Sequence, residues 1–354
     1  MPNTVVDAKS RLDLIIKKAR VDLYKPIQIA EVLYRSRTVR DFEILSIESF
    51  RNPSCKWRDL VTKRLLGKVP TSSARYQHDI WNDSAIPPPV LSILDAENHR
   101  TKGGVEHYIY RRFQQRQGTV DGLIALVSNA DPRSFQLQSL LDLFVTSAGI
   151  RRSIDKAYEI VTHSLFETIV TSLRTTVTVS VPHQSFELLR EFEDLAGKLL
   201  GIGRAKTKSE MDAHVFRVGV TNAADRGLDM WANFGPAVQV KHLTLNEELA
   251  TSIIDQVESD SIVIVCRDSD AKVISTVAKQ IGWGRRVRGI VRESELVEWY
   301  DRCLRGTFSK QLAKPLLKQL AEGFKSEFPQ TSGVTAFLAE RGYSQMRVDP
   351  QWKD

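Results

Sequence analysis

The sequence lacks the long apolar runs and cysteine pairs that mark several protein classes. Its longest strongly apolar run, Ser261–Cys266, is far shorter than the roughly 20 residues that span a bilayer, so we expect no membrane segment. Residues 1–20 mix acids and bases and contain no apolar core followed by a small-residue cleavage site, which predicts a cytoplasmic protein. Cys55, Cys266 and Cys303 are far apart and form no C-x-x-C pair, which argues against a disulfide framework and a zinc knuckle.

Nucleotide-binding motifs and repeats are missing as well. Residues 201–203 read Gly-Ile-Gly but do not follow a predicted strand, and no Walker lysine motif occurs, so we do not expect ATP dependence. No internal repeat or low-complexity tract is visible. The 354 residues are 42% hydrophobic and 26% charged, ordinary values for a globular protein of one large or two medium domains.

The positive charge is concentrated at one end of the chain. The net charge is +7, and residues 1–80 carry 16 Lys and Arg against 9 Asp and Glu, while the rest of the chain is balanced. A basic segment attracts polyanions by releasing counterions, which favours a nucleic acid as partner. Three readings stay open: these helices grip phosphates, through pairs such as Lys17 with Lys18 or Lys63 with Arg64, they mainly form a dimer interface, or the charge belongs to a solvated helical face.

The first 150 residues have a helical pattern. Apolar residues recur at three- and four-residue steps from Lys9 to Leu66, and Pro26 fits the start of a second helix. The three prolines in Ser84–Pro89 predict a connector, because proline disrupts helix interiors and central strands. Residues 105–146 look helical again. Their candidate core stripe consists of Phe135, Leu137, Leu140, Leu141 and Phe144.

Strands alternate with helices after Gly149. A helix is expected over 152–174, and later helices are expected over 245–258, 271–281 and 310–327. The predicted strands are 177–181, 214–220, 228–231, 237–243 and 261–267. This order predicts an α/β fold with one mixed sheet flanked by helices. We therefore expect a mostly α-helical N-terminal region over 1–150, a core over 151–305 and a helical C-terminal extension over 306–354.

One predicted hairpin carries a polar trio. Asn233–Pro236 is turn chemistry between two short β-prone runs. If Asp229 lies opposite Gln239, the period of two puts both side chains on one face, and Lys241 joins them. The opposite, buried face then consists of Leu228, Met230, Val238 and Val240. The hairpin would present a carboxylate, an amide and an ammonium at one surface patch.

This trio suits metal-assisted hydrolysis of a phosphodiester. Asp229 and Gln239 supply hard oxygen atoms for Mg²⁺, and the backbone carbonyl of Val240 can complete the protein ligands. Lys241 can orient or help to deprotonate the attacking water and stabilise charge that develops on the phosphate. The alternative is a surface hairpin whose polar residues have no catalytic role.

In this stretch the sequence resembles the PD-(D/E)xK nucleases, in the variant that reads G-x-D followed by Q-x-K. The predicted order of helix, strand and helix after the motif also resembles a restriction-endonuclease-like core. The chain departs from the pattern because no Pro precedes Asp229 and Gln239 stands where an acid is commoner. The number of bound ions, one or two, is therefore open. His242 borders Lys241 but faces the core by alternation, so we expect it to support the site residues from behind or simply to pack there, and not to take part in catalysis.

The same resemblance implies an acid on the helix before the sheet. Asp155, Glu159, His163 and Glu167 step by four and share one slowly rotating helix face. Glu159 is the first choice for this catalytic acid and Glu167 the second. A solvated helix stripe without a catalytic role is the alternative.

Across almost its whole length the chain is similar to the HaeII family of type II restriction endonucleases. The resembling segments are 15–30, 103–106, 153–156, 217–231 and 239–242. The resemblance implies Mg²⁺-dependent cleavage of double-stranded DNA at the palindrome RGCGCY, within a restriction-modification system. It also implies a homodimer, because a two-fold protein matches a two-fold site, and a cognate DNA methyltransferase as functional partner.

Contacts to DNA are harder to assign from the sequence. The stretch 282–288 joins an aromatic, glycine-rich turn to three arginines, as a loop that grips the DNA backbone would. The DNA-binding candidates are Asn222, Arg226, Arg285, Arg286, Arg288, Lys63 and Arg64. Two other functions stay open: a modification- or structure-dependent nuclease of the same fold, and a non-cleaving DNA-binding protein with a degenerate nuclease fold, against which Lys241 argues.

Overall fold

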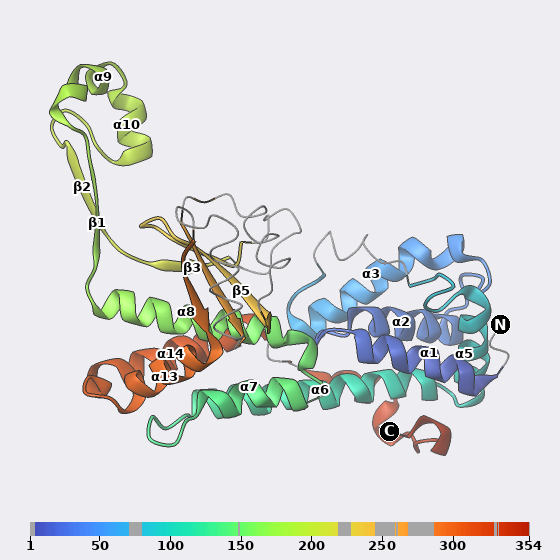
Figure 1. The fold of residues 1–354 in the computed structure, drawn as a ribbon. Coiled ribbons are helices and arrows are strands. Elements are labelled where there is room, and N and C mark those ends of the chain that lie inside the picture. The colour runs from blue at the N-terminus through green and yellow to red at the C-terminus, as the bar shows by residue number, and fades with distance from the viewer. Residues whose placement is uncertain are drawn as a thin grey trace. The chain divides into compact units, whose positions relative to one another are not determined.

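The structure is a computed structural model (Figure 1). It describes residues 4–70, 80–147, 149–218, 228–244, 259, 261–267, 287–328, 331 and 333–353, with the side chains of 242–244 excepted. The chain divides into two compact units. The helical unit combines Met1–Asn129, Gln138–Ala157 and Ala321–Asp354, and the sheet unit combines Ala130–Leu137 and Tyr158–Leu320. The predicted regions 1–150, 151–305 and 306–354 stay a prediction about functional domains.

The N-terminal part of the helical unit confirms the helical pattern of the sequence. Its helices are α1 (Val5–Lys18), α2 (Tyr24–Thr38), α3 (Ile47–Leu66), α5 (Pro88–Arg100), α6 (Gly104–Ser128) and α7 (Leu137–Thr146). The C-terminal elements are α15 (Val334–Glu340), η4 (Tyr343–Gln345) and η5 (Pro350–Trp352). No helix in the described part of the chain is long and apolar enough to cross a membrane.

The predicted connector at residues 84–89 is too long by two residues. Helix α5 begins at Pro88, and Pro87 is its N-cap. Proline is tolerated in the first turn of a helix, because the amide hydrogens there have no partner within the helix and the fixed φ angle of proline suits it. Pro88 and Pro89 therefore start the helix instead of preventing it.

The helical unit contains a buried polar network beside its apolar core. Glu31 on α2 accepts hydrogen bonds from Tyr110 at 2.5 Å and from Arg341 at 3.0 Å. Glu106 on α6, which is fully buried, accepts from Arg37 at 3.0 Å and from Tyr343. Burial raises the pKa of Glu31, and the guanidinium of Arg341 opposes that rise. The network fixes the C-terminal residues 341–343 to helices α2 and α6.

The sheet unit is built around a five-stranded mixed sheet. The strand order is β3 (Val215–Arg217), β4 (Met230–Ala232), β5 (Ala237–Thr244), β6 (Ile262–Arg267) and β7 (Val287–Arg292). The pairs β3 with β4 and β4 with β5 are antiparallel, whereas β5 with β6 and β6 with β7 are parallel. Helix α13 (Glu293–Arg305) and most of α8 (Ile154–Ser172) and α14 (Ser309–Glu327) belong to the same unit, whereas η1 (Arg151–Ser153) belongs to the helical unit. The mixed α/β fold class is thus confirmed.

Parts of the strand prediction need correction. The predicted strand 177–181 is β1 (Thr176–Ser180), but it pairs only with β2 (Lys208–Asp212), outside the five-stranded sheet. Between these two strands lie η2 (His183–Ser185), α9 (Phe186–Glu191) and α10 (Glu193–Leu200). Strand β7 was not predicted. The predicted helices 245–258 and 271–281 lie outside the described residues.

The predicted core stripe around α7 is confirmed. Its five side chains, from Phe135 to Phe144, are at most 6% exposed. In the sheet unit the core consists of β4, β5 and β6 side chains, and β6 is buried on both faces, since Ile264, Val265 and Cys266 have no exposed surface. A continuous apolar run suits a strand that is covered on both sides.

Candidate active site

The hairpin β4–β5 brings the predicted polar trio together. The register pairs Met230 with Val238 and Trp231 with Ala237, so the next pair along is Asp229 with Gln239. The structure thus confirms the predicted register. Met230 and Val238 are buried, as the alternation predicts. Because the side-chain period is two, Asp229, Gln239 and Lys241 lie on one face of the hairpin.

Asp229 is fixed by both strands beside it. Its carboxylate atom Oδ2 accepts hydrogen bonds from Gln239 Nε2 at 2.6 Å and from the backbone N–H of Val240 at 2.7 Å. Its backbone carbonyl accepts from the N–H of Val218 at 2.9 Å, which extends the β3–β4 ladder. The carboxylate is therefore held at the point where β4 begins.

Gln239 differs from the prediction in one respect. We expected it on an exposed surface patch, but its side chain is 2% exposed. Its Oε1 atom is buried and has no hydrogen-bond partner among the described residues. A buried carbonyl oxygen without a partner is costly in a protein interior and is a ready ligand for a cation.

The backbone of Val240 faces the same edge. In a strand the N–H and C=O of one residue point to the same side, and the N–H of Val240 donates to Asp229. The carbonyl of Val240 therefore lies on the β4 side of β5 instead of pointing toward β6. Asp229, Gln239 and Val240 thus each carry an oxygen atom of the kind that Mg²⁺ prefers, and they are joined by the two hydrogen bonds to Asp229 Oδ2. In the described part of the chain, no three His, Cys, Asp or Glu side chains gather as an alternative metal site.

The acids of helix α8 are distinguished by their contacts. Glu167 accepts a hydrogen bond from the backbone N–H of Val215 at 2.7 Å and pairs with His214 Nδ1 at 2.8 Å. His163 lies one turn earlier and donates from Nε2 to the carbonyl of Val215 at 2.9 Å. Burial lowers the pKa of His163. Both side chains thus anchor β3 to α8, which is a structural role for the second-choice acid.

Glu159 remains the first choice for the helix acid. It lies two turns before Glu167 on the same helix and its side chain is 5% exposed. Its role stays a prediction. The alternative of a solvated helix stripe is wrong for both acids, because Glu159 and Glu167 are buried.

An aromatic pair on the face of the trio was missed by the sequence analysis. Phe216 on β3 lies opposite Trp231 on β4, and their rings stack with centroids 4.6 Å apart. Trp231 is two residues from Asp229 and therefore shares its face. Phe216 and Trp231 are 40% and 45% exposed. The alternation of β3 was the available signal, but a three-residue strand gives too short a pattern.

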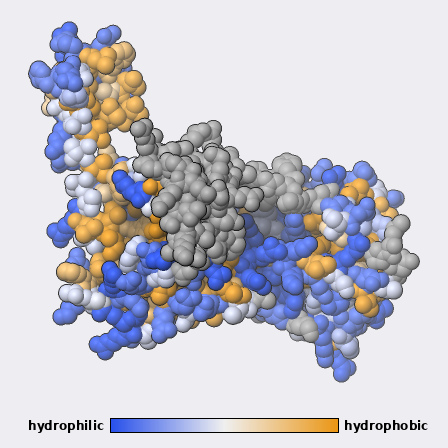
Figure 2. Space-filling model, in the orientation of Figure 1, coloured by the Kyte–Doolittle hydropathy of each residue, from blue (hydrophilic) through white to orange (hydrophobic). Residues whose placement is uncertain are grey.

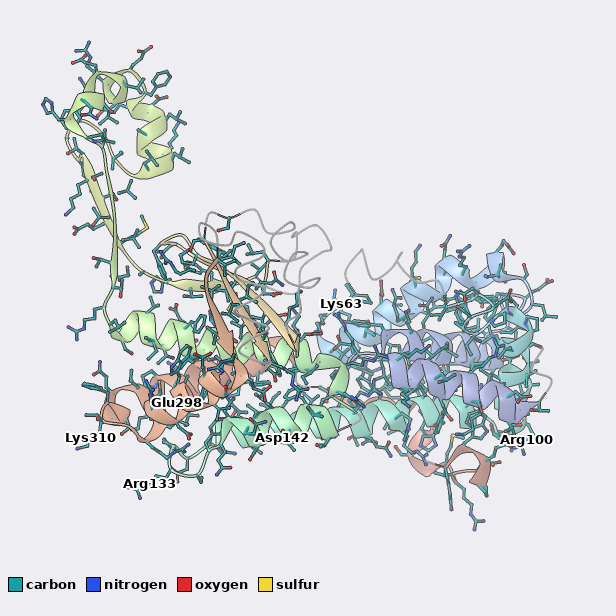
Figure 3. All side chains as sticks on the ribbon, in the orientation of Figure 1. Lys63, Arg100, Arg133, Asp142, Glu298 and Lys310 are labelled. Atoms are coloured by element: carbon teal, nitrogen blue, oxygen red, sulfur yellow. The ribbon has the colours of Figure 1, made fainter. Side chains whose placement is uncertain are left out.

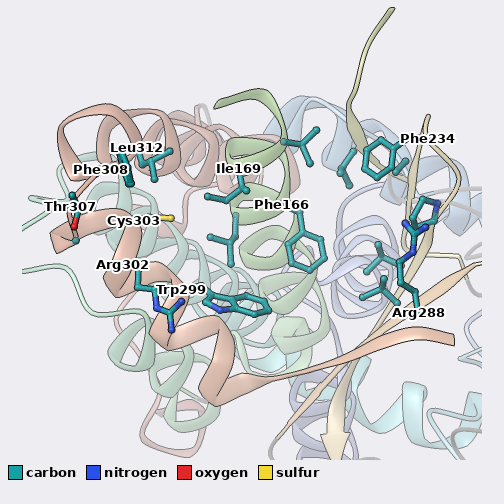
Figure 4. A pocket seen from close by; sticks show the side chains of 18 residues that line it. Phe166, Ile169, Phe234, Arg288, Trp299, Arg302, Cys303, Thr307, Phe308 and Leu312 are labelled. Atoms are coloured by element: carbon teal, nitrogen blue, oxygen red, sulfur yellow. The ribbon is translucent and has the colours of Figure 1, made fainter. Parts of the chain in front are cut away.

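A separate cavity of about 710 Å³ lies on the opposite face of the sheet (Figure 4). Its walls include Phe166 and Ile169 of α8, Trp299 of α13, Phe308, and Val238 of β5. Val238 points away from the face that carries Asp229, so the cavity is not part of the trio's site. Its lining is mostly apolar, with Arg288, Arg302 and Thr307 among the polar residues at its walls.

The DNA-binding candidates are placed only in part. Lys63 is exposed in the last turn of α3 (Figure 3). Arg64 next to it donates to both carboxylate oxygens of Glu340 at 2.7 and 2.6 Å, so its charge is partly neutralised. Arg288 lies in strand β7 and not in the predicted loop. Asn222, Arg226, Arg285 and Arg286 lie outside the described residues.

The chain matches known proteins over nearly its full length. The family model of the HaeII restriction endonuclease matches residues 8–343. The type II restriction enzyme HaeII of Haemophilus aegyptius is 45% identical over 344 residues, which cover 97% of this chain and 98% of that protein. The type II restriction enzyme NgoBI of Neisseria gonorrhoeae is 44% identical over 339 residues, 95% of this chain and 96% of that protein. No solved structure matches the chain.

Proposed function

Because the chain belongs to the HaeII restriction endonuclease family, and is therefore a type II restriction enzyme, we propose that it hydrolyses double-stranded DNA with Mg²⁺ at the palindrome RGCGCY. The observation that carries the proposal is the contact of Asp229, at the start of β4, with Gln239 and Val240 on the neighbouring strand β5. This contact supports the proposal because it joins three residues that each carry a hard oxygen atom, within a chain whose relatives are restriction enzymes. The target sequence is supported by the family resemblance alone.

We assign the roles at the site as follows. Asp229, Gln239 and the carbonyl of Val240 would hold Mg²⁺, which supplies a Lewis acid for the phosphate and acidifies a bound water. Lys241, half-buried on the same face, orients the attacking water and stabilises charge on the phosphate. Glu159 is the proposed acid from α8.

The proposal includes the cellular setting. Two copies act on a two-fold site, and a cognate DNA methyltransferase protects the same sequence in the host genome. Both proteins would work in the cytoplasm, where the cell's DNA is accessible. The methyltransferase is a functional partner and need not bind this chain.

The test is cleavage of a plasmid that carries one RGCGCY sequence. Purified protein should give one linear product with Mg²⁺ and no cleavage with EDTA, and sequencing of the cut ends should return the palindrome. A smear, cleavage at unrelated sequences, or cleavage only of methylated plasmid would contradict the proposal. The last result would point to a modification-dependent nuclease.

Variants test the assigned roles. Asp229→Asn and Lys241→Ala should each slow cleavage by at least about 10²-fold, the loss expected for one group that stabilises developing charge, while specific binding in Ca²⁺ persists. Lys310→Ala, an exposed lysine on α14, is the matched control and should cut normally. Wild-type cleavage by either site variant would remove the mechanism.

The two acids of α8 separate by their readouts. Glu159→Gln should abolish cleavage and leave DNA binding in Ca²⁺ unchanged. Glu167→Gln should lower stability, because an amide cannot accept from both His214 and the N–H of Val215 as the carboxylate does. The opposite pattern would exchange the two assignments.

A further inference from the structure

The segment Thr176–Asp212, called the arm here, forms a separate part of the sheet unit. Strands β1 and β2 pair with each other, from Thr176 with Asp212 to Ser180 with Lys208, and with no other described strand. Figure 1 shows α9 and α10 at the far end of this two-stranded ribbon. The end of the arm, residues 181–207 and called the tip here, is positioned for contacts beyond its own sheet.

The tip is an ordered structure with a core of its own. Leu189, Ala196 and Ile202 are buried against one another, and Val181 packs on them. Arg204 forms an ion pair with Glu193 at 2.7 Å. Because this small core fixes α9 and α10, the side chains that it leaves outside have defined positions.

Those outer side chains include a stripe of large apolar residues. Five of them are 40–74% exposed within thirteen positions: Leu188, Phe192, Leu195, Leu199 and Leu200. Leu195 and Leu199 are four residues apart on α10 and therefore share one face of that helix, while Leu188 lies on α9 and Phe192 at the junction of the two helices. Figure 2 shows apolar residues gathered on one side of the tip and hydrophilic residues on the other. Scattered apolar residues are ordinary on surfaces, but an ordered stripe of this kind marks an interaction surface.

The charge of the tip argues for a protein partner and against DNA. The tip contains four acids, Glu187, Glu191, Glu193 and Asp194, and four cations, Arg190, Lys198, Arg204 and Lys206, so it carries no net charge. A surface that grips the DNA backbone needs an excess of cations. The positive charge of this chain lies in residues 1–80 instead.

The charges along α10 are complementary to a second copy of the same helix. Asp194 lies in its first turn and Lys198 in its last turn, and the row that they form adjoins the row of Leu195 and Leu199. When two such helices pack antiparallel about a two-fold axis, Asp194 of each copy lies opposite Lys198 of the other. The leucine rows then cover each other between these pairs.

We propose that the tips of two copies pack α10 against α10, antiparallel, and so form a dimer contact of this enzyme. The contact is isologous, since the same surface serves both copies. This dimer contact rests on the proposed function in one respect: cleavage at a two-fold symmetric DNA site requires two copies of the chain. It adds the surface through which the copies meet.

The first test is the oligomeric state of the full-length chain by sedimentation equilibrium. Wild type should be a dimer, and the double variant Leu195→Glu/Leu199→Glu should be a folded monomer. The matched control is Leu126→Glu, on α6, where the leucine is 45% exposed, and it should remain a dimer. A monomeric wild type, or a double variant that still dimerises, overturns the proposal. If the double variant still dimerises and the variant Leu14→Glu, on α1, is a monomer, then the dimer contact belongs to the N-terminal helices.

The second test uses the charges and does not depend on apolar residues. Asp194→Lys places lysine opposite lysine, and Lys198→Asp places aspartate opposite aspartate, so each variant alone should raise the dimer dissociation constant by at least about 10-fold. An equimolar mixture of the two variants restores both opposite-charge pairs and should form a mixed dimer with nearly wild-type affinity. If Asp194 and Lys198 interact only within their own helix, then mixing the two variants should not restore the dimer. Absence of rescue would therefore overturn the proposal.

These readouts are independent of cleavage. A chain that dimerises through its tips but never cuts DNA would contradict the proposed function and leave the dimer contact standing. A chain that cuts the palindrome with the tips disrupted and remains dimeric would contradict the dimer contact alone.

Discussion

Replacing Gln239 by Glu tests the metal site through stability instead of activity. In the wild type, Gln239 Nε2 donates to Asp229 Oδ2 at 2.6 Å, and the Gln239 side chain is 2% exposed. The substitution exchanges this donor for a carboxylate oxygen without changing its volume. Two carboxylates then meet in a buried position, where only protonation or a cation can relieve their repulsion.

The cost follows from this geometry. Two unit charges about 4 Å apart repel by about 4 kcal/mol at an effective dielectric constant of 20. The loss of folding stability at pH 7 has an upper limit close to that value. A repulsion of about 4 kcal/mol raises the pKa of the new carboxyl from about 4.3 to about 7, and a stronger repulsion would leave the group protonated and uncharged at pH 7. A protonated carboxyl donates to Asp229 as the amide does. We expect Gln239→Glu to lose about 4 kcal/mol at pH 7, or about 10 °C in melting temperature for a unit of this size.

The sign of the pH dependence is fixed by the raised pKa of the new carboxyl. Below its unfolded pKa of about 4.3 the group is protonated in both states, so the variant should be as stable as wild type. The loss should grow as the pH rises through the folded pKa. Excess Mg²⁺ should return most of the lost stability, because the cation binds only the folded site and neutralises both carboxylates.

The assay is urea unfolding of wild type and variant across this pH range, with and without Mg²⁺. Gln239→Met is the control: it keeps the apolar volume, removes the donor without adding charge, and should show neither the pH dependence nor a gain from Mg²⁺. If Gln239→Glu matches wild type at pH 7 and responds no more strongly to Mg²⁺, then the reasoning about this pair and its metal is refuted.

Three further predictions concern other parts of the molecule. Arg341→Met should destabilise the helical unit by about 3–5 kcal/mol in urea unfolding, because Glu31 stays buried without its cation, and adding Glu31→Gln should recover most of the loss. Burial lowers the pKa of His163, so the folded state resists protonation of this histidine and the wild type should lose stability below pH 6.5, by at most about 1.4 kcal/mol per pH unit. His163→Gln should remove this part of the loss. An unchanged pH profile of unfolding would count against the neutral role of His163 as donor to β3. Lys63→Ala should reduce by about 1 the slope of log binding constant against log salt concentration for DNA binding. Arg64→Ala should change this slope less, because the guanidinium of Arg64 is bound by Glu340 of α15. Equal effects of the two variants would contradict that difference.

The sequence by itself determined the local geometry of the candidate site. A turn at Asn233–Pro236 and the period of two in the flanking strands suffice to pair Asp229 with Gln239, because hairpin register depends on residues that are close in the chain. The helices of residues 5–66 and the buried stripe around α7 followed from three- and four-residue apolar steps for the same reason. These features depend on short-range stereochemistry, which the sequence states directly.

The tertiary structure decided which partners distant residues find. The strand 176–180 has a correct local pattern, but only the fold pairs it with 208–212 instead of the main sheet. Glu159 and Glu167 are equivalent by spacing, and contacts with His214 and Val215, more than 40 residues away, commit the second to anchoring β3. Arg64 looked like a free cation until α15 supplied Glu340.

The physical reason is the range of the interactions. Periodicity and turn chemistry report how a segment of a few residues satisfies its own backbone and which face it buries. Burial of Gln239, the charge partner of Glu31 and the exposed stripe of α10 depend on which surfaces meet after the chain has closed long loops. Those meetings are chosen by the packing of the whole chain, so only the tertiary structure could provide them.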